Sequence, residues 1–90
     1  MRKDKRRIDN PRLKNLGEAL RNRRLHLELT QEQVAKSAEL HRTYVTDVEN
    51  GVRNLTYLTL IKLSIALSSP ASVLLRDAET INGLEVRRPV

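Results

Sequence analysis

Short apolar repeats at helical spacing, opened by helix-capping residues, constrain this chain more than any other feature. Leu13, Leu16 and Leu20 share one face of a helix, and Asn10 followed by Pro11 is a typical helix start. Four more segments of this kind lie further along the chain, with no strand pattern between them. The pattern therefore predicts an all-α fold of five helices.

Capping residues set the expected limits of the middle helices. Thr30 and Gln33 form a capping box, in which each side chain satisfies a backbone amide of the other residue, and they open the second helix. The third helix is expected over residues 42–50 and ends at Gly51, because glycine adopts the left-handed backbone without steric strain. The fourth helix opens at Thr56 and continues through an apolar series. Two short helices joined by a tight turn therefore precede a longer apolar one.

The end of the chain is weakly patterned. Ser69-Pro70 opens a short fifth helix that is expected to end near Leu75, and residues 76–90 favour a tail or a short strand. We therefore divide the chain into an N-terminal arm (1–10), a helical domain (11–76) and a short C-terminal tail (77–90).

Length and composition exclude several classes of protein. Ninety residues suit one small domain, and the presence of only two aromatic residues leaves an aliphatic core. Without cysteine the chain has no disulfide and no thiolate metal site, which suits a reducing, cytoplasmic compartment. No apolar run approaches the ~20 residues that span a bilayer, and the start of the chain does not resemble a signal peptide. We expect a soluble, basic domain without a membrane partner.

Positive charge is concentrated at the N-terminus. Ten of the 17 basic residues but only three of the 11 acidic ones lie in residues 1–24. The basic residues of the arm itself are Arg2, Lys3, Lys5, Arg6 and Arg7. A cationic arm suits a polyanion such as nucleic acid, because each neutralised phosphate releases counterions. The alternative is a solvated segment that has no partner.

The third expected helix has a polar outer face that suits duplex DNA. A single helix fits the major groove, where its side chains meet the base edges. Arg42 can donate two hydrogen bonds to guanine, and Asp47 can accept one from cytosine. Thr43 and Thr46 can donate a hydrogen bond or contact a thymine methyl group. These four residues are predicted to contact bases.

Three stretches of the sequence resemble one known family. They are Leu16-Gly17 with Leu20-Arg21 and Arg24, then Leu29-Thr30-Gln31-Glu32-Gln33-Val34-Ala35, then the segment from Leu40 to Gly51. From about residue 13 to 75 the chain resembles the phage repressor/Cro-type (XRE-like) helix-turn-helix regulators. Residues 41–51 followed by Arg53-Asn54 look like those of restriction–modification controllers. The resemblance implies a lambda-repressor-like fold and a bacterial or phage transcriptional regulator that binds double-stranded DNA sequence-specifically.

The resemblance also implies roles by position. Gln31, at the start of the first motif helix, matches a phosphate-binding residue. Glu49 matches a residue that pairs with an arginine of the first helix, here Arg24. The base-facing positions of the family are matched by Arg42, Thr43, Thr46 and Asp47, and the positions near the sugar-phosphate backbone by Tyr44, Asn50, Arg53 and Asn54. We add His41 as a contact to phosphate or base, and the alternative is an exposed histidine without a role.

Three residues depart from the family pattern. Glu28 and Glu39 stand where the family usually has glycine, after the first helix and in the motif turn. A residue other than glycine is strained at positive φ by about 1–3 kcal/mol, so either the turn differs or its surroundings tolerate the strain. His41 replaces the usual Ser or Thr cap, which weakens the start of the third helix.

An apolar face on the fourth helix predicts a homodimer. Leu58, Ile61 and Ile65 are its apolar residues, and the family is usually polar at the positions of Leu58 and Ile65, which lie seven residues apart on one face. We expect a homodimer interface formed by the fourth and fifth helices; the alternative is that the C-terminal tail of the same chain covers this face. A two-fold dimer places its recognition helices ~34 Å apart, which matches one turn of DNA and a (pseudo)palindromic operator.

Other functions have less support in the sequence. The two histidines lie on different helices and no metal-ligand spacing or phosphate-cradling glycine loop is present, so we expect no enzyme, no cofactor and no metal. The main alternative is an antitoxin-like module that neutralises a protein partner through the tail. RNA binding is a weaker alternative. Proteins that bind RNA usually stack its bases on exposed aromatic side chains, and this chain has only two tyrosines.

Overall fold

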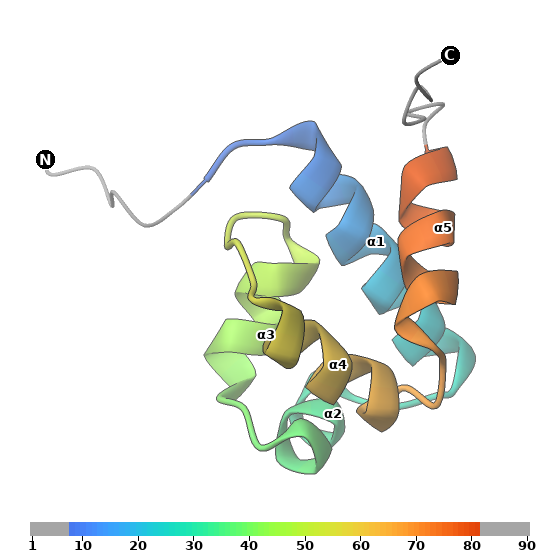
Figure 1. Ribbon diagram of the computed structural model, residues 1–90. Helices are drawn as coiled ribbons and strands as arrows, with labels where there is room; N and C mark the ends of the chain where they lie inside the picture. Colours follow the sequence, from blue (N-terminus) through green and yellow to red (C-terminus); the bar gives the residue numbers. More distant parts are fainter. Residues whose placement is uncertain (1–7, 82–90) are drawn as a thin grey trace, which may run out of the picture.

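The computed structural model describes residues 8–81, and this part of the chain consists of five helices without a strand (Figure 1). The helices are α1 (Pro11–His26), α2 (Gln31–Ala38), α3 (Arg42–Glu49), α4 (Tyr57–Ala66) and α5 (Ala71–Thr80). The all-α, five-helix prediction is confirmed. The arm residues Arg2, Lys3, Lys5, Arg6 and Arg7 and residues 82–90 of the tail lie outside the described residues.

The helix starts agree with the capping residues of the sequence. The Asn10 side chain accepts a hydrogen bond from the backbone N–H of Arg12 at 2.8 Å. In the capping box, Thr30 Oγ1 accepts from the Gln33 N–H at 3.0 Å and Gln33 Oε1 accepts from the Thr30 N–H at 2.8 Å. Thr56 caps α4 through the same kind of bond. These contacts satisfy backbone donors that a helix start leaves without partners.

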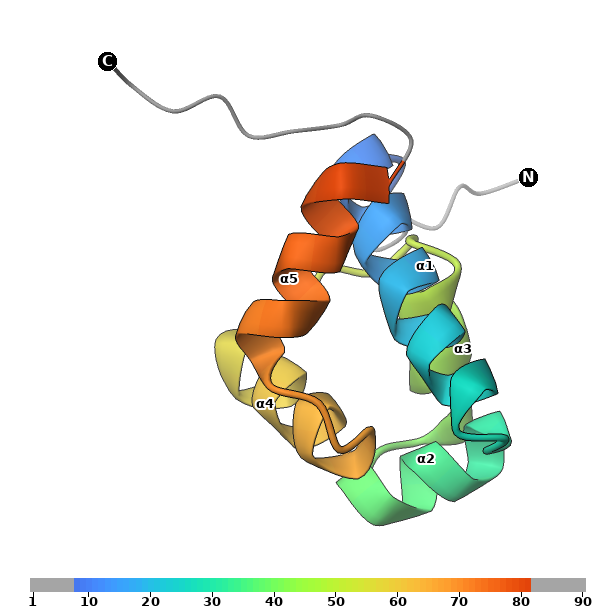
Figure 2. The same ribbon diagram turned by 90° about the vertical axis from the view of Figure 1, so that its right-hand side faces the viewer.

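The fifth helix is longer than the sequence indicates. It continues to Thr80, so the expected end near Leu75 is wrong, and residues 77–80 of the expected tail are helical. α1 and α5 run side by side in opposite directions (Figure 2), and Ala78 is buried in this contact. Asn15 Nδ2 on α1 also donates to the carbonyl of Ile81 at 3.1 Å. Packing against α1 therefore extends α5 beyond the point where its local pattern weakens.

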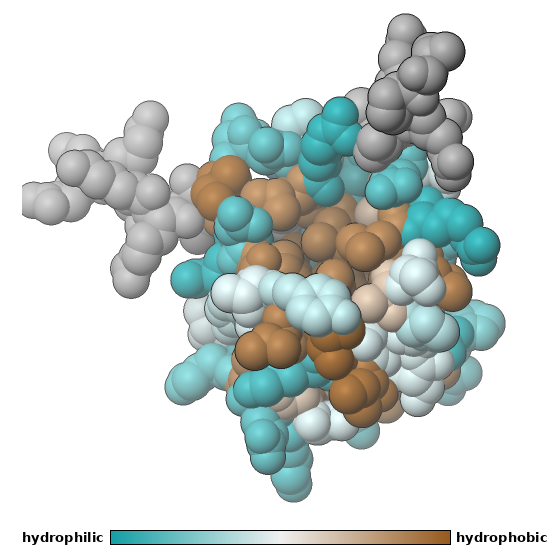
Figure 3. Space-filling view, in the orientation of Figure 1, coloured by the Kyte–Doolittle hydropathy of each residue, from teal (hydrophilic) through white to brown (hydrophobic). Residues whose placement is uncertain are grey.

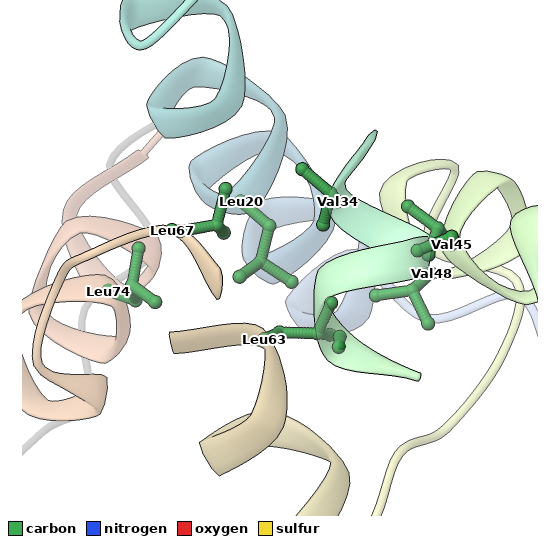
Figure 4. Close-up of a cluster of buried hydrophobic side chains, with 9 residues drawn as sticks. Leu20, Val34, Val45, Val48, Leu63, Leu67 and Leu74 are labelled. Atoms are coloured by element: carbon green, nitrogen blue, oxygen red, sulfur yellow. The ribbon is translucent and has the colours of Figure 1, made fainter. Parts of the chain in front are cut away.

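An aliphatic core joins all five helices. The buried side chains at its centre, shown in Figure 4, are Leu20, Val34, Val45, Val48, Leu63, Leu67 and Leu74. Ala35 and Ala38 are small, so α2 approaches α3 and α4 closely. The core thereby fixes α2 and α3 relative to each other and to α1.

Two of the turns keep a strained backbone. Glu28 and Glu39 both have φ of 58°, in the left-handed region. The motif turn thus has the conformation that glycine would adopt, and each glutamate is strained by about 1–3 kcal/mol. The Leu40 N–H donates to the carbonyl of Ala35 at 2.8 Å, which satisfies a carbonyl at the end of α2.

The junction between α4 and α5 is held onto α1. Arg23 donates from Nε to the carbonyl of Leu67 and from Nη2 to that of Ser68, both at 2.9 Å.

Within residues 8–81 no single helix is long and apolar enough to cross a membrane, and α4 with α5 reaches that length only as a pair bent by 100°. The bend folds both helices around the shared core.

Candidate nucleic-acid interface

Helix α3 lies at the edge of the molecule (left in Figure 1), and its exposed residues are polar. It buries Val45 and Val48 against the core and leaves Arg42, Thr43 and Asn50 exposed. Thr46 and Asp47 are half-buried on the same outer side. The structure thus brings together on one helix face the residues predicted to contact bases.

Two glycines allow α3 to lie directly on α1. A Cβ atom at Gly17 would come within 2.3 Å of the Val48 carbonyl oxygen and 2.5 Å of that of Glu49. Gly51 has φ of +72°, and a Cβ there would lie 2.4 Å from the Cα of Lys14. The sequence analysis identified Gly51 as the end of the third helix, but it did not identify Gly17 as the point where α1 and α3 cross. The signal for that crossing was a small residue between apolar positions. The backbones touch at this point, which fixes how far α3 stands out from the body.

A buried ion pair anchors α3 to α1, as the family resemblance implies. Arg24 donates from Nε to Glu49 Oε2 at 2.6 Å and from Nη2 to Oε1 at 3.0 Å. Its Nη1 also donates to the carbonyl of Leu29 at 2.8 Å. The two side chains are only 10% and 5% exposed, and the hydrogen bonds to Glu49 raise the pKa of Arg24 above its ordinary value. The pair is therefore a charged structural link behind the outer face of α3.

Gln31 extends this link to the outer face. Its Nε2 donates to Glu49 Oε1 at 2.9 Å, and its Oε1 accepts from the Thr46 hydroxyl at 2.8 Å. The Thr46 hydroxyl also lies 3.1 Å from the carbonyl of Arg42, but it has only one proton to donate. The Thr46 hydroxyl proton is therefore used within the protein, and its methyl group is the part that can contact a base. The second N–H of the Gln31 amide is not used by these contacts.

Arg42 and Gln31 border the same surface hollow, between the end of α1 and the start of α2. His41 precedes α3, and its side chain makes no capping hydrogen bond to the helix. His41 and Asn54 are exposed. In residues 8–81 no three His, Asp or Glu side chains are placed to hold a metal ion.

Asp47 and Arg53 form a contact that the sequence did not predict. Arg53 Nη2 donates to Asp47 Oδ2 at 3.3 Å, and the guanidinium carbon lies 5.2 Å from the centre of the Tyr44 ring. Tyr44 and Asp47 are three residues apart on α3 and so are neighbours on its surface, but no sequence signal places Arg53, which lies in the loop after α3, against them. Asp47 is thus paired within the protein.

The last residues of the N-terminal arm lie beside the end of α3. The Ile8 N–H donates to the carbonyl of Val52 at 2.9 Å, one residue beyond the glycine that ends the α3 region. Val52 in turn donates its N–H to the carbonyl of Asp47 at 3.1 Å. These two hydrogen bonds therefore hold Ile8 next to the end of α3.

A second surface of note is apolar and lies on α4. Leu58 and Ile65 are 70% and 72% exposed, Tyr57 is also exposed, and Ile61 is half-buried. Figure 3 shows hydrophobic surface gathered across the face where α4 lies in Figure 1. No part of residues 8–81 covers Leu58 or Ile65, so the expected apolar face is present and open.

Comparison with known proteins places this geometry among DNA-binding regulators. The helix-turn-helix family matches residues 20–74. Control protein C.BamHI of Bacillus amyloliquefaciens is 37% identical over 73 residues, which are 80% of this chain and 89% of that protein. Control protein C.SmaI of Serratia marcescens is 45% identical over 60 residues, which are 67% and 71% of the two chains. The crystal structure of the restriction-modification controller protein C.AhdI from Aeromonas hydrophila aligns with a TM-score of 0.68 and 37% identity, over 69% of this chain and 94% of that one.

Proposed function

The chain belongs to the helix-turn-helix family and is a sequence-specific DNA-binding transcriptional regulator, and on this premise we propose that it is a restriction–modification control protein that binds a (pseudo)palindromic operator as a homodimer. The observation that carries this proposal is the outer face of α3, where Arg42 and Thr43 are exposed and Gln31, beside Arg42, is hydrogen-bonded to Thr46 and to the buried Glu49. We infer that the protein acts in the cytoplasm, and by binding rather than by catalysis.

In the proposed complex α3 lies in the major groove. Arg42 donates to guanine O6 and N7, Thr43 reads a neighbouring base, and Thr46 offers its methyl group to thymine. The start of α2 faces a phosphate, because its backbone N–H groups and the second N–H of the Gln31 amide favour an anion. Tyr44, Asn50, Arg53 and Asn54, together with His41, contact the sugar-phosphate backbone and fix the register of α3.

The arm adds affinity without sequence preference. Ile8, which follows the basic residues of the arm in the sequence, is hydrogen-bonded beside the end of α3 and so lies close to the DNA in this complex. The five basic side chains of the arm neutralise phosphates and release counterions.

The apolar face of α4 joins two subunits. Burying Leu58 and Ile65 contributes ~3–6 kcal/mol per subunit, which favours a second copy of the chain as the occupant of this face. The two-fold symmetry of such a dimer accounts for a palindromic operator.

Arg42→Ala tests the proposed base contact. We expect it to weaken binding to the operator by about 1–3 kcal/mol, roughly 5- to 150-fold, and to change binding to random duplex DNA little. Titration of both duplexes by fluorescence anisotropy measures the two losses. Arg76→Ala, which removes the same charge from an exposed position on α5, is the control. Equal losses on both duplexes would mean that Arg42 contacts only phosphate.

A further inference from the structure

The contact between Tyr44, Asp47 and Arg53, here called the Arg53 cluster, has no counterpart in the roles implied by the resemblance. Arg53 lies in the loop after α3 and folds back over the helix. Its Nη2 is 3.3 Å from Asp47 Oδ2, and its Nε is buried without a hydrogen-bond partner among residues 8–81. The guanidinium is therefore held between a carboxylate and an aromatic ring.

The Arg53 cluster lies at the edge of the face that meets DNA. Thr43, Asp47 and Asn50 succeed one another at helical spacing of four and three residues, so they form one stripe along α3. Thr43 and Asn50 are exposed, whereas the Asp47 side chain is only 16% exposed and turned to Arg53. Arg53 itself remains 34% exposed, so it can still be reached from outside.

Charge and mobility both favour this arrangement for DNA binding. A free carboxylate in this stripe would repel the phosphates of the duplex, and its pairing with Arg53 neutralises it. Arginine is a long side chain with five N–H donors, and its freedom is largely lost when it is stacked and paired. Here that loss occurs when the protein folds, so it does not weaken binding later.

We propose that Asp47 is a positioning residue that holds Arg53 against Tyr44 as a preformed donor to a DNA phosphate, and that Asp47 does not itself contact a base. This inference rests on the proposed function and deepens it. It replaces the cytosine contact expected for Asp47 from its residue type alone.

Asp47→Asn separates positioning from base contact. The asparagine Oδ1 still accepts from Arg53, so we expect the same consensus in selection from a random duplex pool and an operator affinity within ~3-fold of the unmodified protein. If Asp47 contacted cytosine, asparagine would shift that position toward adenine, the base that it pairs with best. Asp77→Asn on α5 makes the same change in net charge at an exposed site and serves as the control.

A double-mutant cycle tests the coupling directly. Asp47→Ala and Arg53→Ala are each expected to weaken operator binding ~10-fold, and the double variant also ~10-fold, because both remove the same phosphate contact. Arg53→Ala should also lower the slope of binding against salt by about one.

Independent losses that multiply to ~100-fold, or a consensus altered by Asp47→Asn, would overturn the role of Asp47 and leave the proposed function intact. Absence of any preferred duplex for the unmodified protein would overturn both.

Discussion

Arg24→Met is expected to lower the free energy of unfolding by about 3–5 kcal/mol, because it leaves the Glu49 carboxylate buried without its cation. The Glu49 side chain is 5% exposed, and within residues 8–81 its carboxylate then keeps only the hydrogen bond from Gln31 Nε2. For a domain of this size the loss corresponds to a fall in Tm of roughly 12–40 °C. Thermal and urea denaturation followed by circular dichroism measure both quantities.

A second variant shows whether the unpaired charge is the cause. Arg24→Met combined with Glu49→Met replaces the pair by apolar side chains of similar size, and we expect it to recover most of the lost stability. It should still weaken operator binding, since Gln31 loses its acceptor and is free to turn away from Thr46. A double variant that is no more stable than Arg24→Met would contradict the charge argument.

Leu58→Glu combined with Ile65→Glu is expected to convert the protein to monomers in sedimentation equilibrium. The two side chains are among the most exposed large hydrophobic residues in residues 8–81, and a carboxylate at each position cannot be desolvated at a subunit contact. Operator binding should fall ~100-fold or more, because the two half-sites are then bound independently. Both positions are open in the single chain, so the fold itself should persist.

Lys36→Glu is the control for charge in this experiment. It lowers the net charge by the same two units from an exposed position on α2, and it should leave the oligomeric state unchanged. Dimers that persist in the Leu58/Ile65 variant would place the subunit contact elsewhere.

Features governed by neighbouring residues were predictable from the sequence. The capping box of Thr30 and Gln33 and the left-handed Gly51 depend on a few adjacent side chains, and both are present. The pair of Arg24 and Glu49 joins positions far apart in the chain, and only the family resemblance indicated it.

Features that depend on packing between distant segments were not predictable. The last turn of α5 exists because α1 lies beside it, and no local residue indicates it. The same holds at the interface, where Gln31 is bonded to Thr46 and Arg53 is folded onto Asp47. Residue type alone gave Asp47 the role of a free acceptor, because its partner lies in a loop whose path the sequence does not specify.

The backbone at Glu28 and Glu39 could not be predicted from residue type either. The sequence left open whether the turns differ or tolerate an unfavourable residue. Both glutamates have positive φ, so the turns are kept and the strain is tolerated. The motif geometry is therefore set by packing in the core and not by the residues of the turn.

The central claim is that α3 distinguishes duplex DNA sequences, and selection of bound duplexes from a random pool tests it most directly. We predict an enriched consensus with two inverted half-sites whose centres lie ~34 Å, or one turn of DNA, apart. Recovery of duplexes with no shared sequence, even at low salt, would contradict it.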